Sequence, residues 1–319
     1  MSFTLWSPAR YWLPLPEGHR FPAEKYEMLY ESIIAEGVAP AARVLDPDAA
    51  SDELLQLAHT PEYVERITSG ALKAGEERRL GFPWSPALVE RSRRTVGGTV
   101  SAARHALKHG VAMNLAGGTH HAFPDHGEGF CVFNDVAITI RLLQREGMIR
   151  RAAVIDLDVH QGNGTHAVFM GDPSVYTFSM HGAHNYPFRP MPEASEVVAG
   201  ESRWGYAVRV PGSLDIELPD GTGDAEYLAR LEDALPRVLR EAQPDIVVYL
   251  AGADPHEGDR LGRMKLTFAG LERRDVMVLE ACREVGLPVA ITIGGGYGRD
   301  IRDTVAIHVA TARIARAIG

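Results

Sequence analysis

The apolar residues of this chain gather in short runs that alternate with longer stretches of helical periodicity. Helical spacing predicts helices over Val136–Arg145 and Ala225–Ala242, and Ser51 is a suitable N-cap for a helix over Asp52–His59. Five apolar runs are typical of strands buried on both faces, namely Ala112–Leu115, Ala152–Leu157, Ser174–Ser179, Asp245–Leu250 and Pro288–Ile293. The alternation predicts an α/β fold with a central, mainly parallel sheet.

Polar or glycine-rich segments follow four of these runs directly. Leu115 precedes Ala-Gly-Gly-Thr-His-His, and Leu157 precedes Asp-Val-His-Gln-Gly-Asn-Gly. Leu250 precedes Ala-Gly-Ala-Asp, and Ile293 precedes Gly-Gly-Gly-Tyr. Sites in open parallel sheets form beyond the carboxyl ends of the strands, so we expect these four segments to meet at one place.

Composition narrows the classes of protein that fit. The 319 residues contain no repeat and no linker, which predicts a single domain over residues 1–319. A net charge of -9 argues against a nucleic-acid partner and permits cationic substrates such as lysine-rich peptides or polyamines. The basic cluster Arg91-Ser-Arg-Arg94 is therefore expected to be a solvated helix face.

Three further features concern the compartment. The two cysteines are too few for a disulfide scaffold or a thiolate zinc site. The first 20 residues carry prolines and charges where a signal peptide would carry an apolar run. No apolar run approaches the ~20 residues that cross a bilayer. We therefore expect a cytoplasmic protein without a membrane partner.

Asp156, Asp158 and His160 are spaced two residues apart, which places them on one face of an extended chain. Buried charge needs a partner, and a metal ion is the simplest one. Carboxylate and imidazole ligands suit Zn²⁺ and also Fe²⁺, Co²⁺ or Mn²⁺. The alternative is a solvated turn with a hydrogen-bonded histidine. Asp254 would complete a set of three ligands with an open position, as in catalytic zinc sites, or would cap a helix.

Two other segments carry side chains suited to catalysis. The adjacent His120 and His121 follow Gly117-Gly118, and near a metal they could supply a general base and an electrostatic partner. Otherwise they are surface polar residues. Tyr297 follows three glycines and could donate to a developing oxyanion, or could belong to an ordinary turn.

Together these residues resemble the histone deacetylase superfamily. The resemblance covers roughly residues 15 to 310 and implies an arginase-like three-layer fold. Two of the segments, His160-Gln-Gly-Asn-Gly and Gly-Gly-Tyr, are most similar to those of the class IV branch and its bacterial relatives. Five motifs occur in the order of the family: Gly117-Gly-Thr-His-His-Ala, Gly129-Phe-Cys-Val-Phe-Asn-Asp, Asp156-Leu-Asp-Val-His-Gln-Gly-Asn-Gly, Gly252-Ala-Asp and Gly294-Gly-Gly-Tyr.

The resemblance implies roles for individual residues. It assigns zinc to Asp158, His160 and Asp254, a ligand set that also accepts Fe²⁺. His121 would act as general base and then acid, and Tyr297 would polarise the acyl carbonyl. His120 would give electrostatic support, with Asp156 behind it.

The resemblance also implies a substrate channel and a second ion. Gly129 and Phe130 would line an acyl-lysine channel, and Tyr186 would form part of its opposite wall. A structural potassium ion would lie at four residues, partly through backbone oxygens: Asp156, Asp158, His160 and Ser179.

Two positions depart from the most familiar members of the family. Asn163 stands where many class I members have an aspartate paired with the second histidine, which predicts a lower pKa for His121. Leu261 stands where the polyamine deacylase branch has an acidic gatekeeper, which favours acyl-lysine or longer acyl chains. The stretch Leu80-Gly-Phe-Pro-Trp84 could form an apolar rim at the channel mouth or an ordinary packed loop.

These observations predict a metal-dependent amide hydrolase that removes an acyl group from an acylated amine, such as acetyl-lysine or a longer acyl-lysine. An acetylpolyamine deacylase is one alternative. A second is an arginase-like ureohydrolase with two manganese ions, although the loop after His160 supplies no further carboxylate. A third is a catalytically silent acyl-lysine-binding protein, although no expected ligand, histidine or tyrosine is missing.

Overall fold

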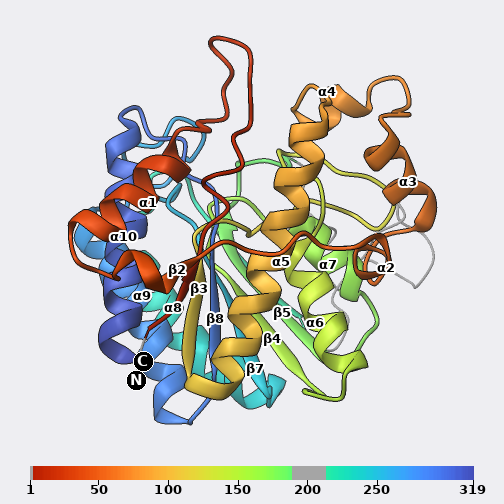
Figure 1. The fold of residues 1–319 in the computed structure, drawn as a ribbon. Coiled ribbons are helices and arrows are strands. Elements are labelled where there is room, and N and C mark those ends of the chain that lie inside the picture. Colours follow the sequence, from red (N-terminus) through yellow and green to blue (C-terminus); the bar gives the residue numbers. More distant parts are fainter. Residues whose placement is uncertain (1–2, 189–212) are drawn as a thin grey trace.

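The computed structural model describes residues 3–188 and 213–319 (Figure 1). In these residues, eight strands form one sheet in which every neighbouring pair is parallel, in the order β2-β1-β3-β8-β7-β4-β5-β6. The strands are β1 Leu5–Trp6, β2 Val44–Leu45, β3 Val111–Asn114, β4 Ala152–Asp156, β5 Val175–Gly182, β6 Ser213–Leu218, β7 Ile246–Ala251 and β8 Val289–Ile293. This confirms the α/β class and the parallel sheet.

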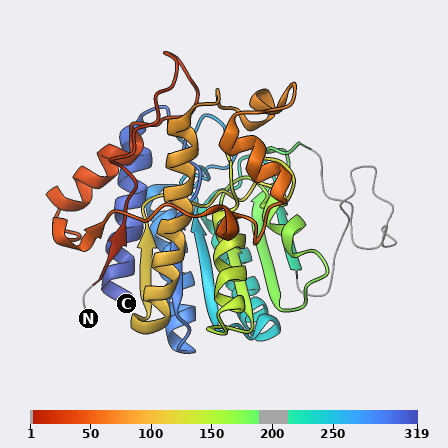
Figure 2. The same cartoon turned by 45° about the vertical axis from the view of Figure 1, so that its right-hand side comes forward.

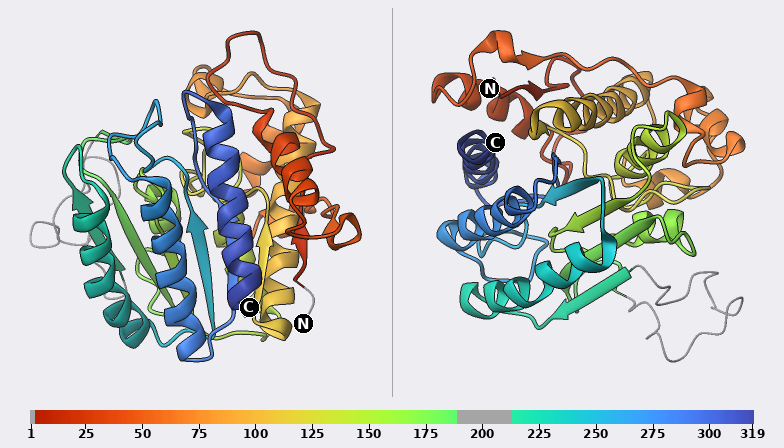
Figure 3. Two further views of the ribbon diagram at one scale, coloured as in Figure 1. Left: turned by 90° about the vertical axis from the view of Figure 1, so that its left-hand side faces the viewer. Right: turned by 90° about the horizontal axis from the view of Figure 1, so that it is seen from below.

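Helices cover both faces of the sheet and make three layers, which Figure 3 shows from the side and from below. One face carries α5 Pro86–His109, α6 Asp135–Arg145 and α7 Asn163–Phe169, and beside them lie α2 Asp52–Leu55, α3 Pro61–Ser69 and α4 Glu76–Leu80. The other face carries α1 Lys25–Ala35, α8 Asp224–Ala242, α9 Phe268–Glu284 and α10 Ile301–Ile318. A short 3-10 turn, Ala41–Arg43, leads into β2.

Two hydrophobic cores separate these layers, and the strands contribute to both. In β4, Ala153 and Ile155 pack into the core beneath α8, α9 and α10. Ala152 and Val154 pack into the core beneath α5 and α6. Because successive side chains of a strand point to opposite faces, a strand covered on both sides must be apolar at every position. This explains why the central strands read as continuous apolar runs.

All five strands expected from the sequence are present, with ends that differ by at most three residues. Three further strands, β1, β2 and β6, have no clear hydrophobic pattern in the sequence and were not predicted. Of these, β2 and β6 form the two edges of the sheet. Two-residue strands are too short to show periodicity. Helix α2 ends at Leu55, earlier than expected, because Leu57 and Ala58 turn back to bond carbonyls only three residues away. Ser51 does cap it, accepting from the Leu54 N–H.

The basic cluster on α5 corrects one expectation from the sequence. Arg91 is only 8% exposed, and its guanidinium donates to the carbonyls of Pro8 and Tyr11. Its neighbours at positions 93 and 94 donate to the carbonyls of Ala50 and Pro47. These arginines are therefore not a solvated face. They tie the N-terminal segment to α5, because they donate hydrogen bonds to backbone carbonyls that follow β1 and β2 and have no partner within the sheet.

The topology brings the motif-bearing strands together. The strands β3, β8, β7 and β4 are consecutive neighbours at the centre of the sheet, and each precedes one of the four polar segments. Since all strands run the same way, as Figure 2 shows, these segments leave the sheet at one edge. Among the described residues, no helix has the length and apolar character needed to cross a membrane.

Candidate metal centre and catalytic pocket

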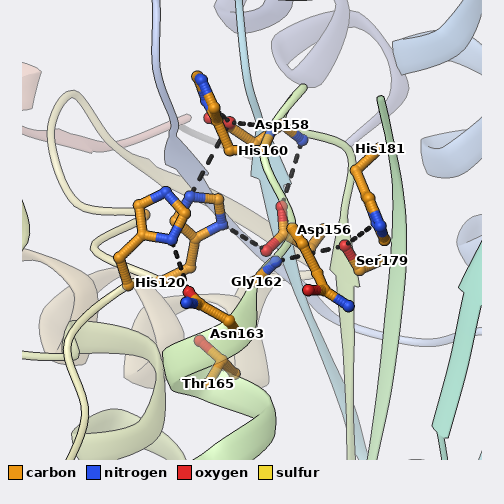
Figure 4. A network of polar contacts seen from close by, with 12 residues as sticks. His120, Asp156, Asp158, His160, Gly162, Asn163, Thr165, Ser179 and His181 are labelled. Atoms are coloured by element: carbon orange, nitrogen blue, oxygen red, sulfur yellow. Dashed lines mark hydrogen bonds and ion pairs between the residues drawn. The ribbon is translucent and has the colours of Figure 1, made fainter. Parts of the chain in front are cut away.

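Three buried side chains converge at this edge of the sheet. Asp158 and His160 follow β4, Asp254 follows β7, and their ligand atoms all lie within 4.8 Å of one another. The Nδ1 atom of His160 is 3.0 Å from an Asp158 oxygen and 3.1 Å from an Asp254 oxygen. Figure 4 shows Asp158 and His160 beside each other in the polar network that includes His120 and Asp156.

The charges of this cluster are suited to a bound cation. Burial opposes protonation of His160, but Asp158 and Asp254 raise its pKa to about 10. Burial and the negative charge of Asp158 raise the pKa of Asp254 to about 7. The Asp254 oxygen nearest His160 makes no well-aligned hydrogen bond to any described residue. Two carboxylates and an imidazole with these properties fit a divalent metal ion of the zinc type, which would supply the missing positive charge.

Glycines let the backbone approach the two carboxylates closely. A Cβ atom on Gly295 would lie 1.8 Å from an Asp254 oxygen, and one on Gly294 would lie 2.6 Å from an Asp158 oxygen. Backbone amides hold the carboxylates in turn, since the N–H of Val159 donates to Asp254 at 2.9 Å. The glycines before Tyr297 are therefore required by the space beside the ligands.

The two adjacent histidines have different partners. His120 donates from Nδ1 to Asp156 at 2.7 Å, whereas Nδ1 of His121 lies 2.7 Å from the amide oxygen of Asn163. Burial opposes protonation of His120, but Asp156 and Asp158 raise its pKa to about 9. Burial, followed by the charges of neighbouring histidines, lowers the pKa of His121 well below its ordinary value. The surroundings of His120 thus favour its protonated form, and those of His121 favour the neutral form.

Asp135, the first residue of α6, orients the loop that carries these histidines. It accepts hydrogen bonds from the N–H groups of Gly118 and Thr119 and from the hydroxyl of Thr99. The side chain is fully buried. A buried carboxylate with this many donors fixes the backbone immediately before His120.

A pocket of about 600 Å³ leads from the surface to the metal cluster. Burial raises the pKa of the Tyr297 hydroxyl well above its usual value, so the phenol stays protonated and can donate. The pocket is lined by every residue expected for the channel, namely Gly129, Phe130, Tyr186 and Leu261. It is also lined by three candidates for the catalytic centre, His121, His160 and Tyr297.

The backbone at Phe130 takes an unusual conformation to place its ring in this wall. Its φ is +65°, and its N–H donates to the carbonyl of Leu80 at 2.8 Å. Leu80 and Phe82 are buried, and the indole N–H of Trp84 donates to the Ile67 carbonyl. The stretch from Leu80 to Trp84 is therefore mainly a packed loop that supports Phe130, with only Gly81 lining the pocket.

The residues expected at a potassium site are also neighbours. Asp156 of β4 and Ser179 of β5 are paired in register, and the Ser179 hydroxyl accepts from the Gly162 N–H at 3.4 Å. The same hydroxyl lies 2.9 Å from Nδ1 of His181, as Figure 4 shows. Binding of potassium here remains a prediction.

Several residues near the pocket were not identified from the sequence. Glu128 contacts Asn163, and Asp259 accepts from the N–H of Tyr297 at 2.6 Å. Lys25 is 2% exposed, with Nζ 5.6 Å from the centre of the Tyr297 ring. The sequence signals were an acidic residue directly before the Gly-Phe-Cys motif and an aspartate five residues after Asp254, whereas Lys25 lies far from any motif.

The mouth of the pocket is basic although the chain as a whole is acidic. Arg20, Arg78 and Arg79 line it, and no aspartate or glutamate does so among the described residues. All three arginines are exposed. A substrate with extended positive charge would therefore meet repulsion at the entrance.

Comparisons with known proteins agree with this geometry. The sequence profile of the histone deacetylase domain matches residues 19–312. An uncharacterized protein of Picosynechococcus sp. is 42% identical over 99% of both chains. Histone deacetylase 2 of Arabidopsis thaliana is 32% identical over 88% of this chain and 70% of its own length. The acetoin utilization protein AcuC of Bacillus subtilis is 29% identical over 94% and 78%.

Solved structures give the same result. An HDAC homologue from Aquifex aeolicus superposes with a TM-score of 0.85 at 25% identity, covering 99% of this chain and 84% of that one. An HDAC homologue complexed with SAHA gives the same TM-score and coverage at 26% identity. The arginase-like fold implied by the motifs is thereby confirmed. The chain belongs to the histone deacetylase family, and its relatives support a deacetylase-type hydrolase that depends on a metal ion.

Proposed function

We propose that this protein is a zinc-dependent deacylase that hydrolyses the linear amide of an acyl-lysine, acetylated or with a longer acyl chain, in a protein or peptide. One observation carries the proposal. His121, whose pKa is lowered, and Tyr297, whose pKa is raised, line the same pocket as His160 of the Asp158, His160 and Asp254 cluster. We place this activity in a single cytoplasmic domain spanning residues 1–319.

Asp158, His160 and Asp254 would hold the metal, and their donors accept Fe²⁺ as well as Zn²⁺. When bound, the ion supplies Lewis-acid chemistry that polarises a carbonyl and acidifies a water molecule. His121 takes a proton at Nε2 during attack and returns it to the leaving amine. The Tyr297 hydroxyl donates to the carbonyl oxygen as negative charge develops there. Protonated His120, held by Asp156, adds positive charge beside the reacting group.

The pocket walls suit an acyl-lysine side chain. Gly129 and Phe130 on one side and Tyr186 on the other would enclose the methylene groups of the lysine. The apolar Leu261 at the same pocket leaves a polyamine without the carboxylate that would pair with its charge. Bound potassium would support the floor of the site, with the residues already named for it: Asp156, Asp158, His160 and Ser179.

The structure bears on each alternative. An acetylpolyamine is cationic along its length, and the mouth offers it Arg20, Arg78 and Arg79. A ureohydrolase needs a second metal, and the described residues provide one cluster of three potential ligands. A silent acyl-lysine-binding protein would have no need of a neutral imidazole and a buried phenol directed at one metal cluster.

The test is hydrolysis of a panel of acyl-lysine peptides, from acetyl to myristoyl, beside acetylated polyamines. Zinc-loaded wild type is compared with Tyr297→Phe and His121→Ala. Activity that is lost in both variants, on at least one acyl-lysine peptide, supports the proposal. Absence of activity on every panel member, with one zinc per chain, would exclude it and favour the binding protein. Preference for the polyamines would exclude the acyl-lysine assignment.

A further inference from the structure

Glu128 is a charged residue in the pocket region to which the reaction described above gives no role. It lies directly before Gly129, and its side chain is only 16% exposed. The ion-pair partner within 4 Å in the described part of the chain is His126, whose Nε2 lies 3.7 Å away. A carboxylate that is largely buried without an arginine or lysine beside it requires other hydrogen-bond donors.

Two neutral side chains supply those donors. The amide nitrogen of Asn163 donates to Glu128 at 2.9 Å, and the Tyr186 hydroxyl forms a further hydrogen bond with it. Although burial favours the neutral acid, the bonds from His126, Tyr186 and Asn163 outweigh it and lower the pKa of Glu128. The side chain is therefore a carboxylate, and a carboxylate can only accept hydrogen bonds.

This restriction determines which way the Asn163 amide points. Its NH₂ group must face Glu128, so its oxygen faces Nδ1 of His121 at 2.7 Å and also accepts from the Gly164 N–H at 3.0 Å. An oxygen at that position requires the proton of a neutral His121 to lie on Nδ1. The lone pair of the ring is then on Nε2.

The reversed amide would be unfavourable at every contact. Its oxygen would face the Glu128 carboxylate, and its NH₂ group would face the Gly164 N–H. It would also donate to Nδ1 of His121 and move the ring proton to Nε2, where the imidazole could no longer accept a proton. Without Glu128, fewer contacts would favour one orientation of the Asn163 amide over the other.

We propose that Glu128 is a positioning residue that orients the Asn163 amide and so holds His121 in the tautomer whose Nε2 can accept a proton. The proposal rests on the deacylase function proposed above. It also accounts for the asparagine: an aspartate at position 163 would place two carboxylates at the 2.9 Å contact that Asn163 and Glu128 now share.

Exchange of the acid and the amide tests this arrangement. Asn163→Asp alone should lower kcat at least about 10-fold, because like charges then meet at that contact. Glu128→Gln alone should also lower kcat about 10-fold, since one of its two acceptor oxygens becomes an NH₂ group, which cannot accept from the donors around it; a wrong tautomer in a serine protease triad costs about 10⁴. The double variant should return to within about threefold of wild type, because the new amide at position 128 donates to the new carboxylate at position 163.

A purely structural role for Glu128 predicts a different result. If Glu128 only holds the Tyr186 ring, then Tyr186→Phe, which removes the hydroxyl and keeps the ring, should reproduce the Glu128→Gln defect. The double variant would then be no better than either single variant. Steady-state measurements separate the two cases, because the proposal predicts a loss in kcat with KM changed by less than about threefold.

A second readout does not depend on activity. Nitrogen-15 NMR of the His121 imidazole in the zinc-loaded protein should show the proton on Nδ1 in wild type and a mixture of tautomers in Glu128→Ala. An unchanged tautomer in that variant, or no rescue in the double variant, would overturn the proposal. Wild type that is inactive on all substrates but shows the expected tautomers would instead refute only the proposed deacylase function.

Discussion

Gly295 offers a direct test of how closely the backbone surrounds the metal ligands. It lies between β8 and Tyr297, and its φ is outside the left-handed region, so alanine fits the backbone without strain. The effect of Gly295→Ala is therefore steric. The added Cβ would lie 1.8 Å from an Asp254 oxygen and 3.0 Å from an Asp158 oxygen.

The structure sets the size of the expected effect. To extend a 1.8 Å approach to the 3.4 Å of an ordinary contact, the Asp254 carboxylate must retreat by about 1.6 Å. Metal–ligand distances tolerate only about 0.2 Å. Loss of a residue that merely supports a ligand costs about 10–100-fold in affinity. Displacing a ligand should therefore weaken zinc binding at least about 100-fold, or about 2.8 kcal/mol.

Zinc affinity is measured by competition with a chelator, beside the thermal midpoint of the metal-free protein. Gly223→Ala is the matched control, because its new Cβ would meet only the Lys265 carbonyl at 3.7 Å. We expect the control to bind zinc as wild type does. If Gly295→Ala folds and keeps zinc affinity within threefold of wild type, the inferred position of Asp254 as a ligand is wrong.

Three further predictions concern catalysis and stability. Tyr297→Phe should lower kcat by about 10²–10³ while zinc content stays at one per chain, which metal analysis and kinetics would check; an unaffected kcat would remove the phenol from the reaction. Asp135→Ala should cost about 3 kcal/mol in denaturant unfolding, because it leaves the N–H groups of Gly118 and Thr119 without their acceptor and leaves the Thr99 hydroxyl only the Thr95 carbonyl, whereas the exposed Asp233→Ala should cost little. Burial lowers the pKa of His59 to about 4 in the folded protein, so the unfolded chain, with a value near 6.5, binds more protons between these pH values. Stability should be lost as the pH falls through this window, by up to about 3 kcal/mol, and His59→Gln should remove that part of the pH dependence; an equal slope in both proteins would contradict it.

The sequence alone was sufficient for the fold class and for the positions of the central strands. Residues such as Val154 and Ile155 are buried on opposite faces, so a doubly covered strand leaves a continuous apolar run that can be read locally. The edge strand β6 alternates between exposed and buried positions and was missed. The two residues of β1 pair with strands on both sides, and their pairing follows from tertiary packing alone.

The candidate metal ligands could also be predicted from sequence, because each follows a strand in a recognisable motif. Asp158 and His160 are two residues apart, and Asp254 completes the cluster from a neighbouring strand. Parallel strands end at one edge, so topology brings such motifs together without further information. The catalytic roles assigned to His121 and Tyr297 remain predictions until they are measured.

Only the tertiary structure decided how these groups are oriented and what charge surrounds them. Glu128 and Asn163 are 35 residues apart, and neither residue indicates by itself that one sets the amide orientation of the other. The pattern around Arg91 predicts a solvated face because the actual partners of the cluster are backbone carbonyls between 43 and 83 residues earlier. Hydrogen-bond direction and burial depend on which distant segments meet, and a local pattern carries no record of that.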